Sequence, residues 1–297
     1  MYELTQVGRQ SYYISSPAKI GIYTPDCGSA YLIDSGSDKD AGRKARQILE
    51  KNGWTLRGIL TTHSNADHIG GCRYLQQQTG CKVFAPGIER AFTEHTILEP
   101  SFLYGGYPPS DLRHKFLLAQ ECAAADVTDA DFPAEVECIP LPGHFFHMTG
   151  YRLPDGTVFT ADCVSSKETL DKYQIGFIYD VKAYLETLDK AASMDGRVFV
   201  PSHAEVCDSM GELARINREK VLEIADRIAA LCDTPMNFEA ILQRLFRDYG
   251  LAMDFAQYVL VGSTVRSYLS FLRDAGRLDV EFADGLMLWK KAGGGNV

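Results

Sequence analysis

The sequence predicts an α/β fold that is followed by a mostly helical C-terminal region. Up to about residue 205, strand-like and helix-like segments alternate, which is typical of sheets covered by helices. Several histidines directly follow apolar, strand-like runs, where loops at a sheet edge can hold reactive side chains. After about residue 208, helix signals replace the strand signals. We therefore expect two units, residues 1–208 and residues 209–297.

Composition and charge narrow the class of protein. Of the 297 residues, 45% are hydrophobic and 23% are charged, which is typical of a globular protein with a sizeable core. The net charge of -9 argues against nucleic acid or an anionic membrane as the main partner. The N-terminus has no signal-peptide pattern and no apolar run could cross a bilayer, so we expect a cytoplasmic protein. The eight cysteines form no C-x-x-C pair, and free thiols are expected.

The N-terminal segments predict a sheet with covering helices. Short runs rich in β-branched and aromatic residues predict an antiparallel meander over 11–16, 19–24 and 30–34. A helix is expected over 37–53, where Ser37 or Asp38 is the N-cap and Gly53 ends it. We then expect a buried strand over 56–63 that ends at His63, a helix over 66–80 and another strand over 81–86.

Residues 88–130 interrupt this rhythm with a segment rich in aromatic residues, glycine and proline. Long insertions of this kind often form lids or pocket walls, and we expect this one to supply most of the pocket. Its aromatic residues either wall that pocket or pack within their own loop: Phe102, Tyr104, Tyr107 and Phe116. His95 and His114 are expected on the surface.

Regular elements return after the insertion. We expect a strand over 136–142, a hairpin over 150–164, a helix over 180–194 and a final strand over 197–203. The C-terminal unit is expected to contain three helices, over 219–232, 237–250 and 255–277, and a terminal hairpin over 276–291.

A group of metal-ligand residue types follows the strand-like runs. The stretch L-T-T-H-S-N-A-D-H-I-G-G places His63, Asp67 and His68 within six positions. Three more candidates follow or lie in later strand-like runs: His144, Asp162 and His203. Imidazole and carboxylate ligands suit zinc, iron or manganese. The pattern therefore predicts a metal centre.

The ordered set T-T-H-S-N-A-D-H, L-P-G-H, F-T-A-D and V-P-S-H resembles the motif series of the metallo-β-lactamase superfamily over about residues 10–205. L-I-D-S-G, with Asp34, resembles its first motif, and that residue would orient a ligand or loop. The resemblance implies a four-layer αββα sandwich with a binuclear centre. It implies that His63 and His144 hold one metal, that a second is held by Asp67, His68 and His203, and that Asp162 bridges them.

One position departs from the family pattern. Asn65 stands where the family's second histidine is expected, and an amide oxygen is a weak, neutral ligand. We expect a tight second site, and a first site that is weaker, vacant or selective for a harder metal. Asn65 is either a weak or water-mediated ligand, or it is a bystander or a substrate contact. His147 either replaces the missing ligand or lines the pocket, and Lys167 is a candidate anion anchor.

The motif set predicts a metal-dependent hydrolase that uses a metal-activated hydroxide on an ester, thioester, amide or phosphodiester. Asp67 and Asp162 are the expected catalytic carboxylates, the substrate is a small molecule, and one or two divalent ions, zinc first, are expected. The alternatives are an iron-dependent oxidoreductase with oxygen or sulfur chemistry, a nucleic-acid-processing hydrolase and a protein that has lost catalysis. The C-terminal region resembles a winged helix, which would pack on the catalytic unit, on a sister subunit in a homodimer, or on nucleic acid.

Overall fold

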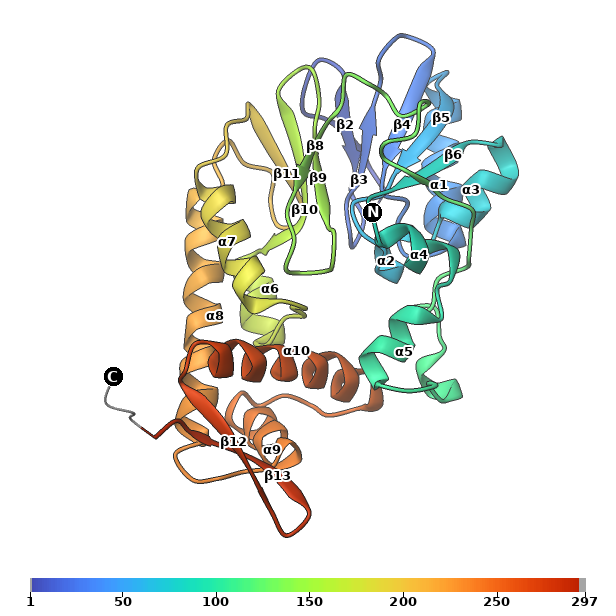
Figure 1. The fold of residues 1–297 in the computed structure, drawn as a ribbon. Coiled ribbons are helices and arrows are strands. Elements are labelled where there is room, and N and C mark those ends of the chain that lie inside the picture. Colours follow the sequence, from blue (N-terminus) through green and yellow to red (C-terminus); the bar gives the residue numbers. More distant parts are fainter. Residues whose placement is uncertain (1, 294–297) are drawn as a thin grey trace.

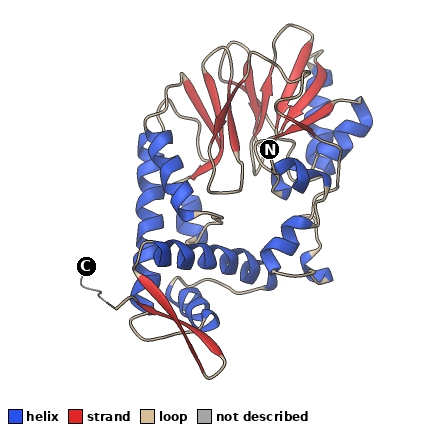
Figure 2. Ribbon diagram, in the orientation of Figure 1, coloured by secondary structure: helices blue, strands red, loops and turns tan. Residues whose placement is uncertain are grey.

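Two β-sheets lie face to face in the computed structural model, which describes residues 2–293, and helices cover their outer surfaces (Figure 1, Figure 2). The first sheet contains, in spatial order, β1 (Leu4–Gln6), β2 (Ser11–Ile14), β3 (Ile20–Tyr23), β4 (Ser29–Ile33), β5 (Thr55–Leu60), β6 (Lys82–Ala85) and β7 (Ala125–Asp126). The second contains β11 (Val198–His203), β10 (Thr157–Ser165), β9 (Thr149–Arg152) and β8 (Glu137–Pro140).

Three apolar layers hold this arrangement together. Between the sheets, side chains such as Tyr23 and Leu60 pack with Tyr151 and Phe159. Outside the first sheet lie α1 (Lys39–Lys51) and α3 (Cys72–Thr79), and outside the second lie α7 (Val181–Ala192) and α8 (Gly211–Leu231). The predicted α/β class and the four-layer sandwich are confirmed.

The predicted meander and the first helix are confirmed. Strands β2, β3 and β4 pair antiparallel, whereas β4, β5, β6 and β7 are parallel. Asp38 caps α1, because its carboxylate accepts a hydrogen bond from the backbone N–H of Ala41 at 3.0 Å. The chain then turns at Gly53, which has a positive φ of 72°.

The single helix expected over 66–80 is wrong, because the chain forms α2 (Ala66–Ile69) and α3 with a break at Gly70 and Gly71. Both glycines touch the backbone that follows β4. A Cβ on Gly70 would lie 2.3 Å from the carbonyl carbon of Ser37, and one on Gly71 would lie 2.4 Å from the carbonyl oxygen of Ser35. Close backbone contact, which helical periodicity does not report, ends the first helix.

The insertion contains short elements rather than one long one: α4 (Glu89–Glu94), α5 (Leu98–Tyr104), the 3-10 helix η1 (Ser110–Leu112) and β7. One further helix, α6 (Lys167–Tyr173), was not predicted. None of its residues is buried, so the sequence carries no apolar periodicity there.

The three C-terminal helices and the terminal hairpin are confirmed as α8, α9 (Phe238–Asp248), α10 (Phe255–Asp274), β12 (Leu278–Ala283) and β13 (Leu286–Lys291). One apolar core runs from the second sheet through α7 and α8 to α9 and α10. Helix α10 passes below the sandwich and contacts α5 (Figure 1). The unit boundary near residue 208 and the winged-helix resemblance stay predictions.

Two other findings concern the chain as a whole. All eight cysteines are free. Among residues 2–293, no helix is both long and apolar enough to cross a membrane.

Replacing Gly71 with alanine should lower the free energy of unfolding by about 1–3 kcal/mol, because the new methyl group would overlap the backbone of Ser35 and Gly42. The measurement is urea unfolding followed by circular dichroism. Gly28→Ala is the matched control, because the nearest atom to its new methyl group lies 3.8 Å away. Equal stability of the two variants would contradict the close-contact explanation for the helix break.

Candidate metal centre

Six histidine and aspartate side chains meet at one edge of the sandwich. His63 lies in the loop after β5, and Asp67 and His68 lie in α2. From the later part of the chain, His144 lies in the loop after β8, Asp162 lies in β10, and His203 ends β11. They form two groups, His63–His144–Asp162 and Asp67–His68–His203, and the candidate ligand atoms within each group lie within 4.8 Å of one another. The structure thus brings together all six candidates.

Unusual backbone conformations orient the carboxylates of Asp162 and Asp34. Residue Ala161, directly before Asp162, has a positive φ of 52°, and the pairing of β10 with β11 shifts register on both sides of it. A register shift of this kind redirects a strand side chain. Asp34 also has a positive φ, of 62°, at the end of β4. Non-glycine residues in this conformation cost energy and concentrate at functional sites.

Asp34 orients one imidazole. Its Oδ1 accepts a hydrogen bond from the backbone N–H of Thr62 at 2.7 Å, and its Oδ2 accepts one from Thr62 Oγ1 at 2.8 Å. Oδ2 also lies 2.8 Å from Nδ1 of His68. Because Nδ1 is engaged, the Nε2 atom of His68 is presented to the cluster, as the orienting role expected for Asp34 requires.

The donor set fits a divalent cation. Three of its buried atoms make no hydrogen bond within residues 2–293, namely His63 Nε2, His68 Nε2 and Asp162 Oδ1. The last two are 3.2 Å apart but lack hydrogen-bond geometry. A buried polar atom without a partner costs about 1–3 kcal/mol. One or two cations between these atoms would satisfy all of them.

The pKa values support the same conclusion. Burial lowers the pKa of His203, but Asp162 and Asp67 outweigh it and raise the pKa to about 10. For His63, burial and the neighbouring His68 lower the pKa well below its usual range, so this imidazole keeps its lone pair. Two carboxylates therefore attract positive charge to this edge, and a bound cation would displace the proton from His203.

Asn65 is held between the cluster and a buried glutamate. Its Oδ1 lies 3.2 Å from Nε2 of His144, and its amide nitrogen donates a hydrogen bond to Oε1 of Glu99 at 2.7 Å. Glu99 lies on α5 and is 5% exposed. Because an amide nitrogen can only donate, this contact turns the oxygen of Asn65 toward His144. Glu99 was not predicted from the sequence, since nothing in its irregular insertion relates it to the motifs.

A second buried glutamate, Glu89 on α4, was also missed. One carboxylate oxygen accepts hydrogen bonds from the backbone N–H and hydroxyl of Ser64, and the other accepts one from the backbone N–H of His147 at 2.7 Å. This carboxylate ties the loop that carries His63 to the loop that carries His144. Burial raises the pKa of Glu89 to about 7, although its hydrogen-bond donors oppose the shift.

Two predicted residues do not join the cluster. His147 is exposed, and its Nδ1 accepts a hydrogen bond from the backbone N–H of Ile88 at 3.3 Å. Lys167 forms a surface ion pair with Asp171 at 2.6 Å. The two histidines of the insertion, His95 and His114, also lie outside both groups.

The cluster opens into a cavity of ≈ 720 Å³, which we call the central cavity. Only one of its lining residues, Phe116, comes from 88–130, so the expectation that the insertion builds the pocket is wrong. Most of the wall comes from α6, the loop after it, α8 and α10. The other insertion aromatics pack elsewhere: Phe102 against Phe146, and Tyr104 against Phe255. Tyr107 is 73% exposed.

Comparison with known proteins agrees with this fold. The family model described as "Metallo-beta-lactamase superfamily" matches residues 18–203, which contain all six clustered side chains. The chain belongs to the metallo-beta-lactamase superfamily.

Two solved structures share the fold over nearly the whole chain. A beta-lactamase domain protein from Burkholderia ambifaria has a TM-score of 0.74 at 17% identity and covers 98% of this chain and 94% of its own. A metallo-beta-lactamase family protein from Thermus thermophilus has a TM-score of 0.68 at 15% identity, covering 97% of both chains.

Curated relatives match shorter segments. A hydroxyacylglutathione hydrolase from Bradyrhizobium sp. (strain ORS 278) is 43% identical over 70 residues, which are 24% of this chain and 26% of that protein. One from Rhodopseudomonas palustris (strain BisB18) is 58% identical over 63 residues, or 19% and 25%. The chain therefore matches about a quarter of the length of these relatives.

The raised pKa of Glu89 predicts a pH-dependent stability. The folded protein keeps a proton on this carboxyl up to about pH 7, whereas the unfolded chain releases it near the usual value of 4.5. Its contribution is therefore fully present below pH 4.5, and it is lost as pH rises toward 7. The loss should reach about 3 kcal/mol by pH 8.

The measurement is urea unfolding of wild type and Glu89→Gln at several pH values and equal metal loading. The stability of wild type relative to the variant should fall between pH 4.5 and 8. A difference between the two proteins that stays constant with pH would show that Glu89 has the same pKa in the folded protein and in the unfolded chain.

Proposed function

We propose that this protein is a metal-dependent hydrolase that cleaves an ester or thioester of a small molecule. The observation that carries the proposal is that candidate metal-ligand atoms converge at one edge of the sandwich. Within residues 2–293, the Nε2 atoms of His63 and His68 and the Oδ1 atom of Asp162 are buried there without a hydrogen-bond partner. Membership of the superfamily and the name of the curated relatives, hydroxyacylglutathione hydrolase, support it. That name denotes the hydrolysis of a hydroxyacylglutathione.

The two groups of side chains would hold two ions, with zinc as the first choice. His63, His144 and Asp162 would form the first site, with the oxygen of Asn65 completing it. Asp67, His68 and His203 would form the second. Bound ions would lower the pKa of a shared water and polarise the substrate carbonyl.

The chain's own groups position this chemistry. Asp162 lies between the two groups, because its Oδ2 is 3.7 Å from Nε2 of His144 in the first group and 3.1 Å from Nε2 of His203 in the second. Asp67 Oδ2 lies 3.4 Å from His203 Nε2. Asp67 borders the central cavity, where it could accept a proton from an attacking water or pass one to the leaving group.

The nucleic-acid alternative has less support. In the terminal hairpin region, basic side chains are already paired with carboxylates: Arg273 with Asp279 at 2.6 Å, and Lys290 with Glu281 at 2.6 Å. Paired cations contribute little to phosphate binding. The iron-dependent alternative uses the same ligands, and metal analysis with oxygen-consumption assays separates it from hydrolysis.

The function is tested with acetyl and butyryl thioesters and with 4-nitrophenyl acetate. We expect turnover with zinc or manganese, loss of turnover after chelation, and recovery on adding metal back. Asp162→Asn should lower kcat/KM by about a hundredfold or more. Asp189→Asn, at a surface carboxylate on α7, is the control and should behave like wild type. Absence of turnover with every metal, or oxygen consumption with iron, would reject the proposal.

The ligand assignment is tested by metal content and chelator competition. Wild type should release one ion more readily than the other, because a neutral amide oxygen is a weaker donor than imidazole. Asn65→His should tighten the weaker site by about tenfold or more. Asn52→His, at the exposed end of α1, is the control for an added histidine. Identical release curves for wild type and Asn65→His would place Asn65 outside the metal site.

A further inference from the structure

The central cavity changes character away from the metal centre. At one end it is lined by His144, Asp162 and His203, together with Asp67. Beyond them, its wall is mainly apolar and comes from the loop after α6, from α8 and from α10: Ile175, Phe177, Ile178, Val221, Ile224, Leu260 and Val261. Apolar walls with few polar groups are typical of small-molecule sites, and ≈ 720 Å³ lies within their usual range.

The loop after α6, which forms the cavity wall nearest to the metal centre, is held on both sides by hydrogen bonds. The backbone N–H of Tyr179 donates hydrogen bonds to the carbonyls of Gly143 and His144, at 2.9 and 3.1 Å. On the other side, Ile178 N–H donates to Thr264 Oγ1 on α10 at 3.2 Å. The ring of Phe177 packs edge-on against His144, with centroids 5.5 Å apart. This loop therefore places an apolar surface directly beside a candidate ligand.

The charges along the cavity do not suit a polyanion. Its lining contains two lysines, Lys172 and Lys220. The ammonium of Lys220 pairs with Glu223 at 2.7 Å and donates a hydrogen bond to Gln174 at 2.7 Å. That of Lys172 lies over the ring of Tyr173, 4.7 Å from its centroid. With Glu168 also in the wall, a neutral chain fits better than a phosphate-rich one.

One polar group in the wall lacks a partner. Tyr268 on α10 is fully buried, lines the cavity and makes no hydrogen bond through its hydroxyl within residues 2–293. Burial raises its pKa well above the usual value, so the hydroxyl keeps its proton and can donate. The residue lies two helical turns from Val261, on the same face of α10. An oxygen atom on a ligand in the cavity would complete it.

We propose that the central cavity binds the acyl chain of the substrate, a mainly apolar chain of medium length that carries an acceptor oxygen near its far end, where Tyr268 donates to it. The scissile carbonyl then lies at the metal centre, and the chain extends between α8 and α10. This inference rests on the proposed function, because it assigns the substrate of the same site. It also gives the C-terminal helices a direct part in substrate selection.

The test uses metal-loaded, full-length protein and a series of N-acetylcysteamine thioesters from acetyl to decanoyl. Each added methylene should raise kcat/KM by about fourfold until the cavity is filled. Val261→Phe should shift the preferred chain to a shorter one, measured as the ratio of kcat/KM for the octanoyl thioester to kcat/KM for the acetyl thioester. Val221→Phe fills the same space from α8 and replaces the first variant if that one does not fold.

A second comparison tests Tyr268. A 7-oxooctanoyl thioester should be preferred over the octanoyl thioester, and Tyr268→Phe should reduce this ratio of kcat/KM values by about fivefold. Loss of turnover for both chains in Tyr268→Phe would assign this residue a structural role and reject the proposed hydrogen bond.

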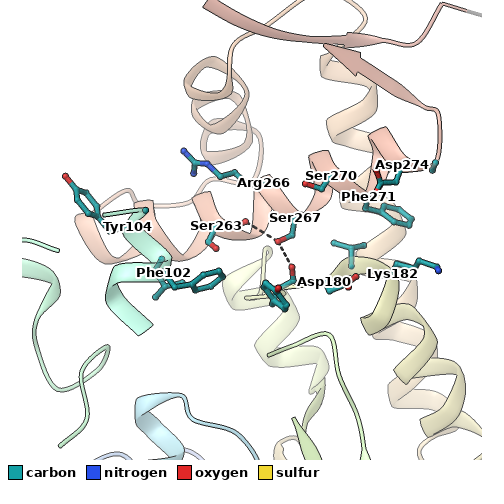
Figure 3. Close-up of a pocket in the computed structure, with 15 residues that line it drawn as sticks. Phe102, Tyr104, Asp180, Lys182, Ser263, Arg266, Ser267, Ser270, Phe271 and Asp274 are labelled. Atoms are coloured by element: carbon teal, nitrogen blue, oxygen red, sulfur yellow. Dashed lines mark hydrogen bonds between the residues drawn. The ribbon is translucent and has the colours of Figure 1, made fainter. Parts of the chain in front are cut away.

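The matched control lies on the other face of the same helix. Ser263, Ser267 and Ser270 face a separate cavity of ≈ 1040 Å³ between α5, α7 and α10, and none of its lining residues belongs to the described metal-binding groups (Figure 3). Ser270→Phe places the same aromatic side chain on α10 outside the central cavity. Its chain-length profile should match that of wild type.

The outcomes separate the two proposals. A flat chain-length profile with clear acetyl turnover would overturn the acyl-chain inference and leave the hydrolase function intact. If neither the thioesters nor 4-nitrophenyl acetate are cleaved, the proposed function fails, and calorimetry with octanoate decides the inference by itself. Binding that weakens in Val261→Phe but not in Ser270→Phe would uphold it, whereas absence of binding would overturn it.

Discussion

The whole site depends on the concentration of carboxylates and imidazoles where loops from both sheets meet. Asp67 and Asp162 attract positive charge strongly enough to raise the pKa of His203 to about 10. The contacts around them keep the donors fixed before any ion binds: Asp34 orients His68, and Glu89 joins the loops of His63 and His144. A preorganised donor set of this kind binds a cation with little rearrangement.

The insertion and the C-terminal helices have different relations to this centre. The insertion supplies buried carboxylates behind the ligand loops, Glu89 and Glu99, and only one residue of the central cavity. The C-terminal helices form much of the cavity wall and share an apolar core with the second sheet. The part of the chain outside the matched family segment thus contributes both to the apolar core and to the wall of the cavity beside the candidate metal centre.

Elements with a strong local signal were predicted from the sequence, and elements defined by long-range contacts were not. The meander, the hairpin of β9 and β10, and the three C-terminal helices follow from periodicity and turn residues. The break between α2 and α3 depends on backbone contacts with Ser35 and Ser37, which are distant in the sequence. Helix α6 has no buried face, so its pattern resembles that of a loop.

The sequence by itself determined the family, the α/β class and the identity of the six clustered side chains, because motif order and residue type survive without knowledge of distances. Only the tertiary structure decided that Glu99 fixes the orientation of Asn65, that His147 points away, and that α8 and α10 wall the cavity. These facts are contacts between segments that lie far apart along the chain. No local pattern encodes such contacts, since they arise when the layers pack.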